Sequence, residues 1–148
     1  MNAAFTILLA EDNEDDVFLL KTALGKAGIS HPIQAVTDGE KAISYLKGEN
    51  EYADRSRYPM PHLFLLDIKM PLKNGLEVLA WLRSNSDNGL KRLPVIIMSA
   101  SDIQQDIDRA YELGVNAYLV KPNAFEDLMR VLKTTSEFWT GMAAHPQI

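Results

Sequence analysis

The chain contains no cysteine among its 148 residues. Disulfides, thiolate metal sites and cysteine nucleophiles are therefore excluded. Its longest apolar runs are a handful of residues, far short of the ~20 that a membrane-spanning helix requires. The N-terminal stretch "MNAAFTILLAEDNEDD" has no basic segment before its short apolar run, so a signal peptide is not expected. We therefore expect a cytoplasmic protein without a membrane partner.

Positive charge is also scarce, with 15 lysines and arginines against 20 acidic residues and a net charge of -5. Nucleic-acid-binding proteins need a basic face, so we expect no nucleic acid as partner. The chain is 47% hydrophobic and 24% charged, which is ordinary for a soluble, folded protein. Its length suits one domain with a sizeable core.

Five short apolar segments alternate with amphipathic stretches along the chain. These candidate strands are residues 5–10, 33–37, 62–67, 94–99 and 117–120. Each is a continuous apolar run, the pattern of a buried strand in a parallel sheet that is covered on both faces. Strand and helix alternating five times predicts a doubly wound α/β fold with right-handed crossovers.

Apolar residues recur at helical spacing between these segments. Asp102 and Asn123 are candidate N-caps of two of the predicted helices, and Gly28 and Gly114 are candidate C-terminal stops. No linker divides the chain, so we expect one domain over residues 1–148. A long polar loop at 47–62 and a C-terminal extension at 135–148 depart from the regular alternation.

Polar residues stand where the predicted strands end. The first strand ends on Glu11 and Asp12, the third on Asp67, the fourth on Ser99 and the fifth on Lys121. In an open parallel sheet, ligands bind beyond the carboxyl ends of the strands. Three carboxylates, one hydroxyl and one ammonium are therefore expected to gather at one edge of the sheet.

These residue types favour a metal-assisted reaction at phosphorus. Three ionised carboxylates at close range raise one another's pKa unless a cation is present. Oxygen ligands without cysteine or neighbouring histidine favour Mg²⁺, with Mn²⁺ as the second choice. A carboxylate beside Mg²⁺ and a lysine can attack a phosphoryl group and form an acyl phosphate. The Ser99 hydroxyl could then donate to a phosphoryl oxygen.

The segments "LLAEDN", "LLDIKMPLKNG", "IIMSAS" and "YLVKP", in this order, resemble the receiver domain of two-component response regulators. The resemblance covers residues 5 to about 134, and several separate motifs in the right order make it specific. It implies a flavodoxin-like (βα)5 sandwich with a five-stranded parallel sheet in the order 2-1-3-4-5.

The resemblance also implies roles for individual residues. Asp67 would be the phosphoacceptor, Lys121 the phosphoryl-binding lysine, Ser99 the switch hydroxyl and Tyr118 the aromatic switch. The Mg²⁺ ligands implied are Glu11, Asp12, Asp67 and the backbone carbonyl of Lys69.

Other matching positions concern the shape of the site. Met70, Pro71 and Gly75 match the loop around the acceptor, and Pro122 matches a proline that in the family follows the lysine through a cis peptide. The Lys69 side chain occupies a position that faces the phosphoryl group in the family, where it could shield an acyl phosphate from water.

The function implied is a phosphorylation switch that accepts a phosphoryl group from a sensor histidine kinase and signals by contact with a downstream protein. It would not be an enzyme acting on another substrate. The 47–62 loop and the "SEFW" tail are similar to stand-alone receivers that partner bacterial phytochromes. A homodimer through the last two helices and the tail is another partner that the sequence allows.

Alternatives stay open beside this interpretation. A receiver fold could serve as a phosphorylation-independent interaction module. An aspartyl-phosphate hydrolase is disfavoured because Lys69 stands where such phosphatases usually carry a second aspartate. Nucleotide-binding enzymes are disfavoured because neither G-x-G-x-x-G nor G-x-x-x-x-G-K-[ST] occurs. Ser99 could simply cap the approach to a helix, and Tyr118 could be a core residue. The three histidines, His31, His62 and His145, are interpreted as structural or surface residues.

Overall fold

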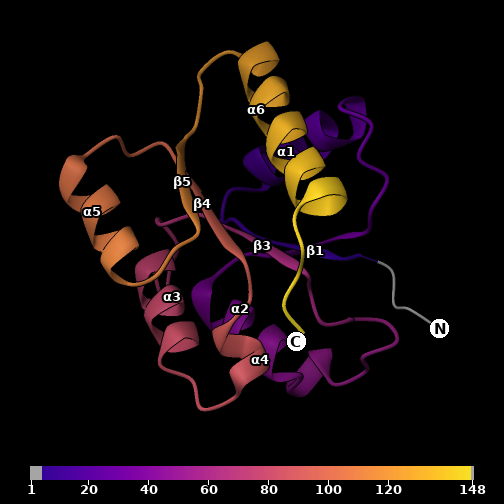
Figure 1. Ribbon diagram of the computed structural model, residues 1–148, viewed down its shortest axis with the longest axis vertical. Helices are drawn as coiled ribbons and strands as arrows, with labels where there is room; N and C mark the ends of the chain where they lie inside the picture. Colours follow the sequence, from indigo (N-terminus) through magenta and orange to yellow (C-terminus); the bar gives the residue numbers. More distant parts are fainter. Residues whose placement is uncertain (1–4, 148) are drawn as a thin grey trace.

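The computed structural model describes residues 5–147. The first four residues of the N-terminal stretch considered above, and Ile148, lie outside this range. Five parallel strands form one sheet in the order β2-β1-β3-β4-β5 (Figure 1). They are β1 (Ile7–Ala10), β2 (Ile33–Val36), β3 (Leu63–Leu66), β4 (Val95–Ser99) and β5 (Ala117–Val120). The predicted fold class and strand order are confirmed.

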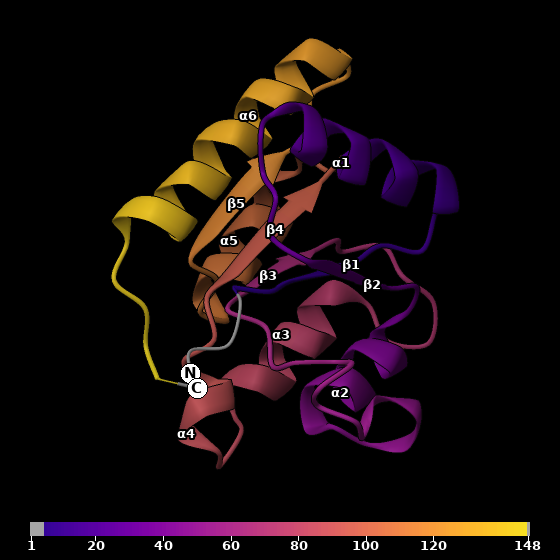
Figure 2. The same cartoon turned by 90° about the vertical axis from the view of Figure 1, so that its right-hand side faces the viewer.

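The helices lie on both faces of the sheet. They are α1 (Glu14–Lys26), α2 (Gly39–Lys47), α3 (Gly75–Arg83), α4 (Asn88–Lys91), α5 (Gln104–Glu112) and α6 (Phe125–Glu137). Figure 2 shows α1 and α6 on one side of the sheet and α2 and α3 on the other. Within residues 5–147, no helix is long and apolar enough to cross a membrane.

Alternate residues of the inner strands supply two separate apolar cores. In β1, Leu8 and Ala10 face the α2–α3 side, whereas Ile7 and Leu9 face the α1–α6 side. Side chains point to opposite faces of successive strand positions, so a strand covered on both faces must be apolar throughout. This explains the continuous apolar runs of β1, β3 and β4, all of which are fully buried.

The prediction of continuous burial is wrong for the two remaining strands. β2 and β5 are largely half-buried, and Val120 is 43% exposed. Both strands lie at the edges of the sheet, where helices cover them less completely. The apolar runs identified the strands correctly but could not distinguish central from edge positions.

Two of the predicted helix boundaries are also wrong. α5 and α6 begin after Ile103 and Ala124, one residue beyond the expected caps Asp102 and Asn123, and neither has a side-chain cap hydrogen bond. The predicted stops are confirmed, because Gly28 (φ 86°) follows the end of α1 and Gly114 (φ 96°) follows the end of α5. Glycine adopts this left-handed conformation without a steric penalty.

The 47–62 segment is packed against the core, although its sequence predicts a polar loop. The Arg55 guanidinium donates to the carbonyl oxygens of Tyr45 (2.8 Å) and Leu46 (2.9 Å) in the last turn of α2. The rings of Tyr45, Tyr52 and Tyr58 contact one another at centroid distances of 5.1 to 6.0 Å. The arginine and the tyrosines, rather than the many polar residues, determine how this segment folds.

The C-terminal extension returns to the opposite end of the sheet from the strand ends described above. α6 runs into a π-helical turn, Phe138–Met142, and the chain then reaches the ring of Phe5. His31, His62 and His145 contact that ring at centroid distances of 5.2, 5.0 and 5.0 Å. The Thr6 amide donates to His62 Nδ1 (3.1 Å). All three histidines therefore occupy packed, structural positions.

These contacts predict an acid-sensitive contribution to stability. Burial lowers the pKa of His62, and His145 and His31 lower it further. A histidine pKa that is lower in the folded state gives stability that is complete above the unfolded value of about 6.5 and is lost as the pH falls through the folded pKa.

We expect His62→Asn to reduce the loss of unfolding free energy between pH 7 and pH 5, because an asparagine carbonyl can accept the Thr6 amide without titrating. Urea unfolding of both proteins at the two pH values measures this. His31→Asn serves as the matched control on the same aromatic ring, and an equal acid loss in wild type and His62→Asn would contradict the assignment.

Candidate functional site

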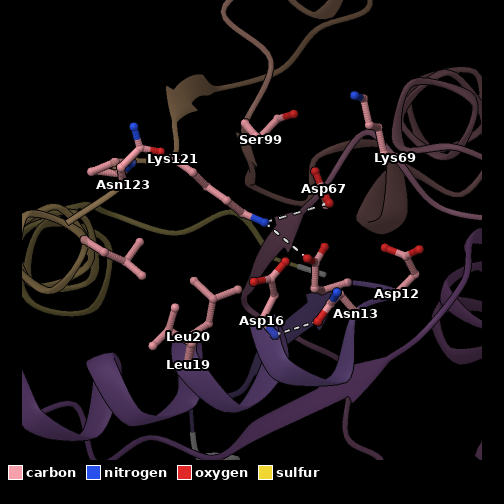
Figure 3. Close-up of a pocket in the computed structure, with 14 residues that line it drawn as sticks. Asp12, Asn13, Asp16, Leu19, Leu20, Asp67, Lys69, Ser99, Lys121 and Asn123 are labelled. Atoms are coloured by element: carbon pink, nitrogen blue, oxygen red, sulfur yellow. Dashed lines mark hydrogen bonds and ion pairs between the residues drawn. The ribbon is translucent and has the colours of Figure 1, made fainter. Parts of the chain in front are cut away.

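The parallel register brings the acidic residues of two strands together. Ala10 of β1 pairs with Leu66 of β3, so Glu11 and Asp67 follow at equivalent positions on neighbouring strands. Ligand oxygens of Glu11, Asp12 and Asp67 lie within 4.8 Å of one another, and this is the one such acidic or histidine cluster found in residues 5–147. The predicted gathering of three carboxylates is thus present in the structure (Figure 3).

Lys121 extends from the end of β5 toward this cluster (Figure 3). Its Nζ lies 3.2 Å from Glu11 Oε1 and 3.8 Å from Asp67 Oδ2. The three side chains are shielded from solvent, with exposed fractions of 17% for Lys121, 2% for Glu11 and 11% for Asp67. One ammonium cannot balance three carboxylates, so the site retains an excess of negative charge.

Glu11 shows the effect of that excess most clearly. Burial raises its pKa to about 9, with the Asp67 and Asp16 carboxyl groups adding to the effect and Lys121 opposing it. Its Oε2 atom is buried without a hydrogen-bond partner. A buried carboxylate with one oxygen atom left without a partner can be stabilised further by a proton or by a cation. The cluster therefore fits a hard divalent cation such as Mg²⁺ or Mn²⁺, which oxygen ligands bind preferentially.

The loop after β3 shapes the acceptor side of the site. Asp67 Oδ1 accepts a hydrogen bond from the Ile68 amide (2.8 Å), and the Gly75 amide donates to the Ile68 carbonyl (2.8 Å). A Cβ at position 75 would overlap the Asp67 backbone carbonyl. Gly75 is required because the backbone of Asp67 passes against it.

The expectation of a cis peptide before Pro122 is not met, because every peptide bond in the described range, including Lys121–Pro122, is trans. The Lys121 amide donates to the Ser99 carbonyl (2.7 Å). Pairing between β4 and β5 thus continues as far as the lysine and directs its side chain toward the carboxylates.

Ser99 is the last residue of β4, and Tyr118 is the second residue of β5. Ser99 is buried at the rim of the cavity that holds the carboxylates. Its Oγ accepts from the Ser101 amide (3.2 Å). Tyr118 lies outside this cavity, packed at the edge of the α2–α3 core, and its hydroxyl donates to the Ser101 carbonyl (2.9 Å).

The remaining predicted site residue, Lys69, is exposed. It lines the cavity, but its side chain points away from the carboxylates in Figure 3.

One acidic residue of the site, Asp16, was not among the residues predicted from the sequence. It lies in the acidic first turn of α1, and it also lines the cavity and acts on Glu11. Asn13 caps α1 by accepting from the Asp16 amide (3.0 Å). An N-cap at Asn13 places Asp16 at the third helical position, whose side chain turns back toward the cap, and that spacing was the available signal.

Comparison with known proteins identifies the family. The sequence model of the family described as the response regulator receiver domain matches residues 7–133. The chain belongs to this family. Phosphorylation-based signalling is the general function of its members, which act as signalling switches rather than as classical enzymes.

Individual relatives are similar to this chain over almost the whole length of both sequences. The response regulator Rcp1 of Synechocystis is 37% identical over 93% of this chain and 90% of the relative. The crystal structure of the phosphorylated cyanobacterial phytochrome response regulator RcpA has a TM-score of 0.88 and 39% identity, covering 98% of this chain and 100% of that one. The Mn²⁺-bound form of Rcp1 has a TM-score of 0.84 and 36% identity, covering 96% and 99%.

The raised pKa of the buried Glu11 carboxyl group leads to a stability prediction for the metal-free protein. A raised carboxyl pKa gives stability that is complete below the unfolded value of about 4.5 and is lost as the pH rises through the folded value of about 9. In EDTA at pH 8, Glu11→Gln should therefore increase the unfolding free energy by on the order of 1–3 kcal/mol, since each unit of pKa shift corresponds to about 1.4 kcal/mol.

Urea unfolding at pH 8 and pH 5, with and without Mg²⁺, tests this. The gain should shrink at pH 5, and added Mg²⁺ should stabilise wild type more than Glu11→Gln. Asp12→Asn is the control, because that side chain is exposed and its replacement should change metal-free stability less. A metal-free Glu11→Gln protein less stable than wild type at pH 8 would show that Glu11 is satisfied as a carboxylate.

Proposed function

We propose that this receiver accepts a phosphoryl group on Asp67 from a sensor histidine kinase in a Mg²⁺-dependent reaction. The observation that carries the proposal is the convergence of Asp67 with Lys121 and the acidic pair Glu11–Asp12 at one sheet edge. A structural carboxylate would not need this arrangement, since a single lysine partner or a solvent-exposed position would be sufficient.

In the proposed reaction, a carboxylate oxygen of Asp67 attacks the phosphorus atom. The bond from phosphorus to the imidazole nitrogen of the donor histidine breaks, and the histidine leaves with the bonding electron pair. Lys121 Nζ, 3.8 Å from Asp67 Oδ2, is positioned to stabilise negative charge on the oxygen atoms of the transferred group. Glu11, Asp12, Asp67 and the Lys69 backbone carbonyl would hold Mg²⁺, which when bound supplies charge neutralisation at the phosphoryl oxygens.

Ser99 and Tyr118 are the proposed switch residues. The Ser99 hydroxyl can donate to a phosphoryl oxygen on Asp67, since it lies at the rim of the same cavity. Tyr118 is linked to Ser99 through the backbone of Ser101. We infer that phosphorylation changes this linkage and remodels the surface formed by β5, α5 and the preceding loop.

The proposed partners follow from the relatives. RcpA is a phytochrome response regulator, and another similar structure is a response regulator in red light signaling of R. palustris, at 36% identity and a TM-score of 0.91. A phytochrome-type histidine kinase is therefore the proposed donor, in the cytoplasm, with residues 1–148 acting as one receiver unit. A downstream protein and a second copy of the chain are the proposed targets of the signal.

A phosphorylation-independent docking module is the second candidate. The exposed apolar residues Tyr111 (52%), Val120 (43%) and Phe138 (47%) would favour protein contact whether or not Asp67 is modified. The buried Glu11 carboxyl group, whose Oε2 atom has no hydrogen-bond partner, argues against this candidate, because a docking module gains nothing from that energetic cost.

The first test is the mass of the intact protein after incubation with acetyl phosphate and Mg²⁺. We expect one phosphoryl adduct that requires Mg²⁺ and is absent from Asp67→Asn. Lys121→Gln should form the adduct more slowly and retain the fold. If neither acetyl phosphate nor a phosphorylated phytochrome-type kinase labels wild type, the docking module becomes the better proposal.

A second test concerns Lys69. We expect Lys69→Asn to shorten the half-life of the phosphorylated protein several-fold, because the long Lys69 side chain, which here points away from the carboxylates, can turn over the acyl phosphate and hinder the approach of water. Lys69→Met keeps the length without the charge and separates steric shielding from electrostatics. Decay is followed by the loss of the adduct mass with time, and equal half-lives in all three proteins would exclude a shielding role.

A further inference from the structure

We propose that Ser101 and Asp106 form a positioning link that transmits the state of the Asp67 site to helix α5. Ser101 lies in the connection between β4 and α5, two residues beyond Ser99. The inference rests on the proposed phosphorylation of Asp67 and assigns a specific route by which its effect leaves the site.

Ser101 makes hydrogen bonds to three different parts of the switch, and its hydroxyl also accepts from the Ile103 amide (3.4 Å) at the N-cap of α5. Its amide donates to Ser99 Oγ (3.2 Å), its carbonyl accepts from the Tyr118 hydroxyl (2.9 Å), and its own hydroxyl donates to Asp106 Oδ2 (2.7 Å). Two of these bonds use the backbone, which any residue would provide. The third requires a hydroxyl side chain, and its partner lies in the first turn of α5.

The Ser99 hydroxyl can donate one hydrogen bond and accept another at the same time. A hydroxyl has one donor hydrogen and two acceptor lone pairs. Ser99 can therefore donate to a phosphoryl oxygen on Asp67 and still accept from the Ser101 amide. Movement of the Ser99 hydroxyl toward the phosphoryl group would then draw Ser101 in the same direction, and the two other bonds of Ser101 would follow.

Helix α5 is well suited to respond to a small displacement. Ala110 is its one fully buried residue, and its first turn lacks a side-chain cap hydrogen bond. The Ser101 hydroxyl joins the preceding loop to this turn, since it donates to the half-buried Asp106 carboxylate. Because α5 buries so little of its surface, moving Ser101 should move the first turn.

A separate hydrogen bond connects the C-terminal part of α5 to β5. The Tyr118 amide donates to the Tyr111 hydroxyl (3.2 Å) near the C-terminal end of α5. This contact does not pass through the Ser101 side chain. It allows the two routes to be separated experimentally, because removal of the Ser101 hydroxyl should affect the first turn of α5 and leave the response of Tyr118 in place.

The experiment compares wild type, Ser101→Ala and Ser101→Thr by NMR, before and after addition of beryllium fluoride with Mg²⁺ as a phosphoryl analogue. The readout is the change in amide shifts of Asp106 and Ile107, both of which donate to the Ile103 carbonyl in the first turn, and of Tyr118. In Ser101→Ala the shift change of the first turn should fall severalfold, because the side-chain bond that joins Ser101 to Asp106 is absent, while Tyr118 responds as in wild type.

Ser101→Thr retains the hydroxyl and should preserve both responses. Asp106→Ala should reproduce Ser101→Ala, and the double variant should add little, as expected for two residues acting through one bond. An unchanged first-turn response in Ser101→Ala, with the analogue bound and Tyr118 responding, would overturn the link. Absence of any Mg²⁺-dependent response in wild type, together with absence of the Asp67 adduct by mass, would instead overturn the proposed function on which the link rests.

Discussion

The close approach of the Glu11, Asp12 and Asp67 carboxylates is the constraint on which the rest of the site depends. It follows from the parallel register of β1 and β3, in which Ala10 is paired with Leu66, and relaxing it would require the two central strands to shift. Lys121 compensates part of the charge. Burial and, after it, the neighbouring Asp67 carboxyl group raise the pKa of Glu11. The fold thus maintains a site that is stabilised by added positive charge and that responds when a phosphoryl group redistributes charge around it.

The sequence specified the interior of this fold more fully than its borders. Continuous apolar runs identified all five strands, because central parallel strands must bury both faces. The same runs overestimated the burial of β2 and β5, since edge position depends on the order in which strands assemble. The 47–62 segment was assigned as a polar loop because hydrophobic periodicity is absent there, whereas Arg55 and three tyrosines pack it through non-local contacts.

The candidate site followed the same pattern. Its charged members could be predicted because each stands at a strand end, and parallel strands bring such ends together. The cooperating residues Asp16, Ser101 and Asp106 were missed because their roles depend on where a helix begins and how a loop turns. The trans peptide before Pro122 was missed for a related reason. Resemblance to a family supplied the expectation of a cis bond, but the pairing of Lys121 with Ser99 in this chain directs the lysine without one.

Helices α3 and α5 differ in how firmly they are packed, and this difference determines which of them should move when Asp67 is modified. α3 buries Gly75, Val78, Leu79 and Leu82, and Arg83 at its end donates to the carbonyl oxygens of Gly114 (2.8 Å) and Leu93 (2.9 Å). α5 buries Ala110 alone. A disturbance at Asp67 reaches α3 through the tightly packed loop at Gly75, where a shift would disrupt a dense core. The same disturbance reaches α5 through single hydrogen bonds at Ser101 and Tyr118. Because displacing α5 disrupts much less packing, the conformational change should appear at α5 and β5, next to the exposed side chains of Tyr111 and Val120.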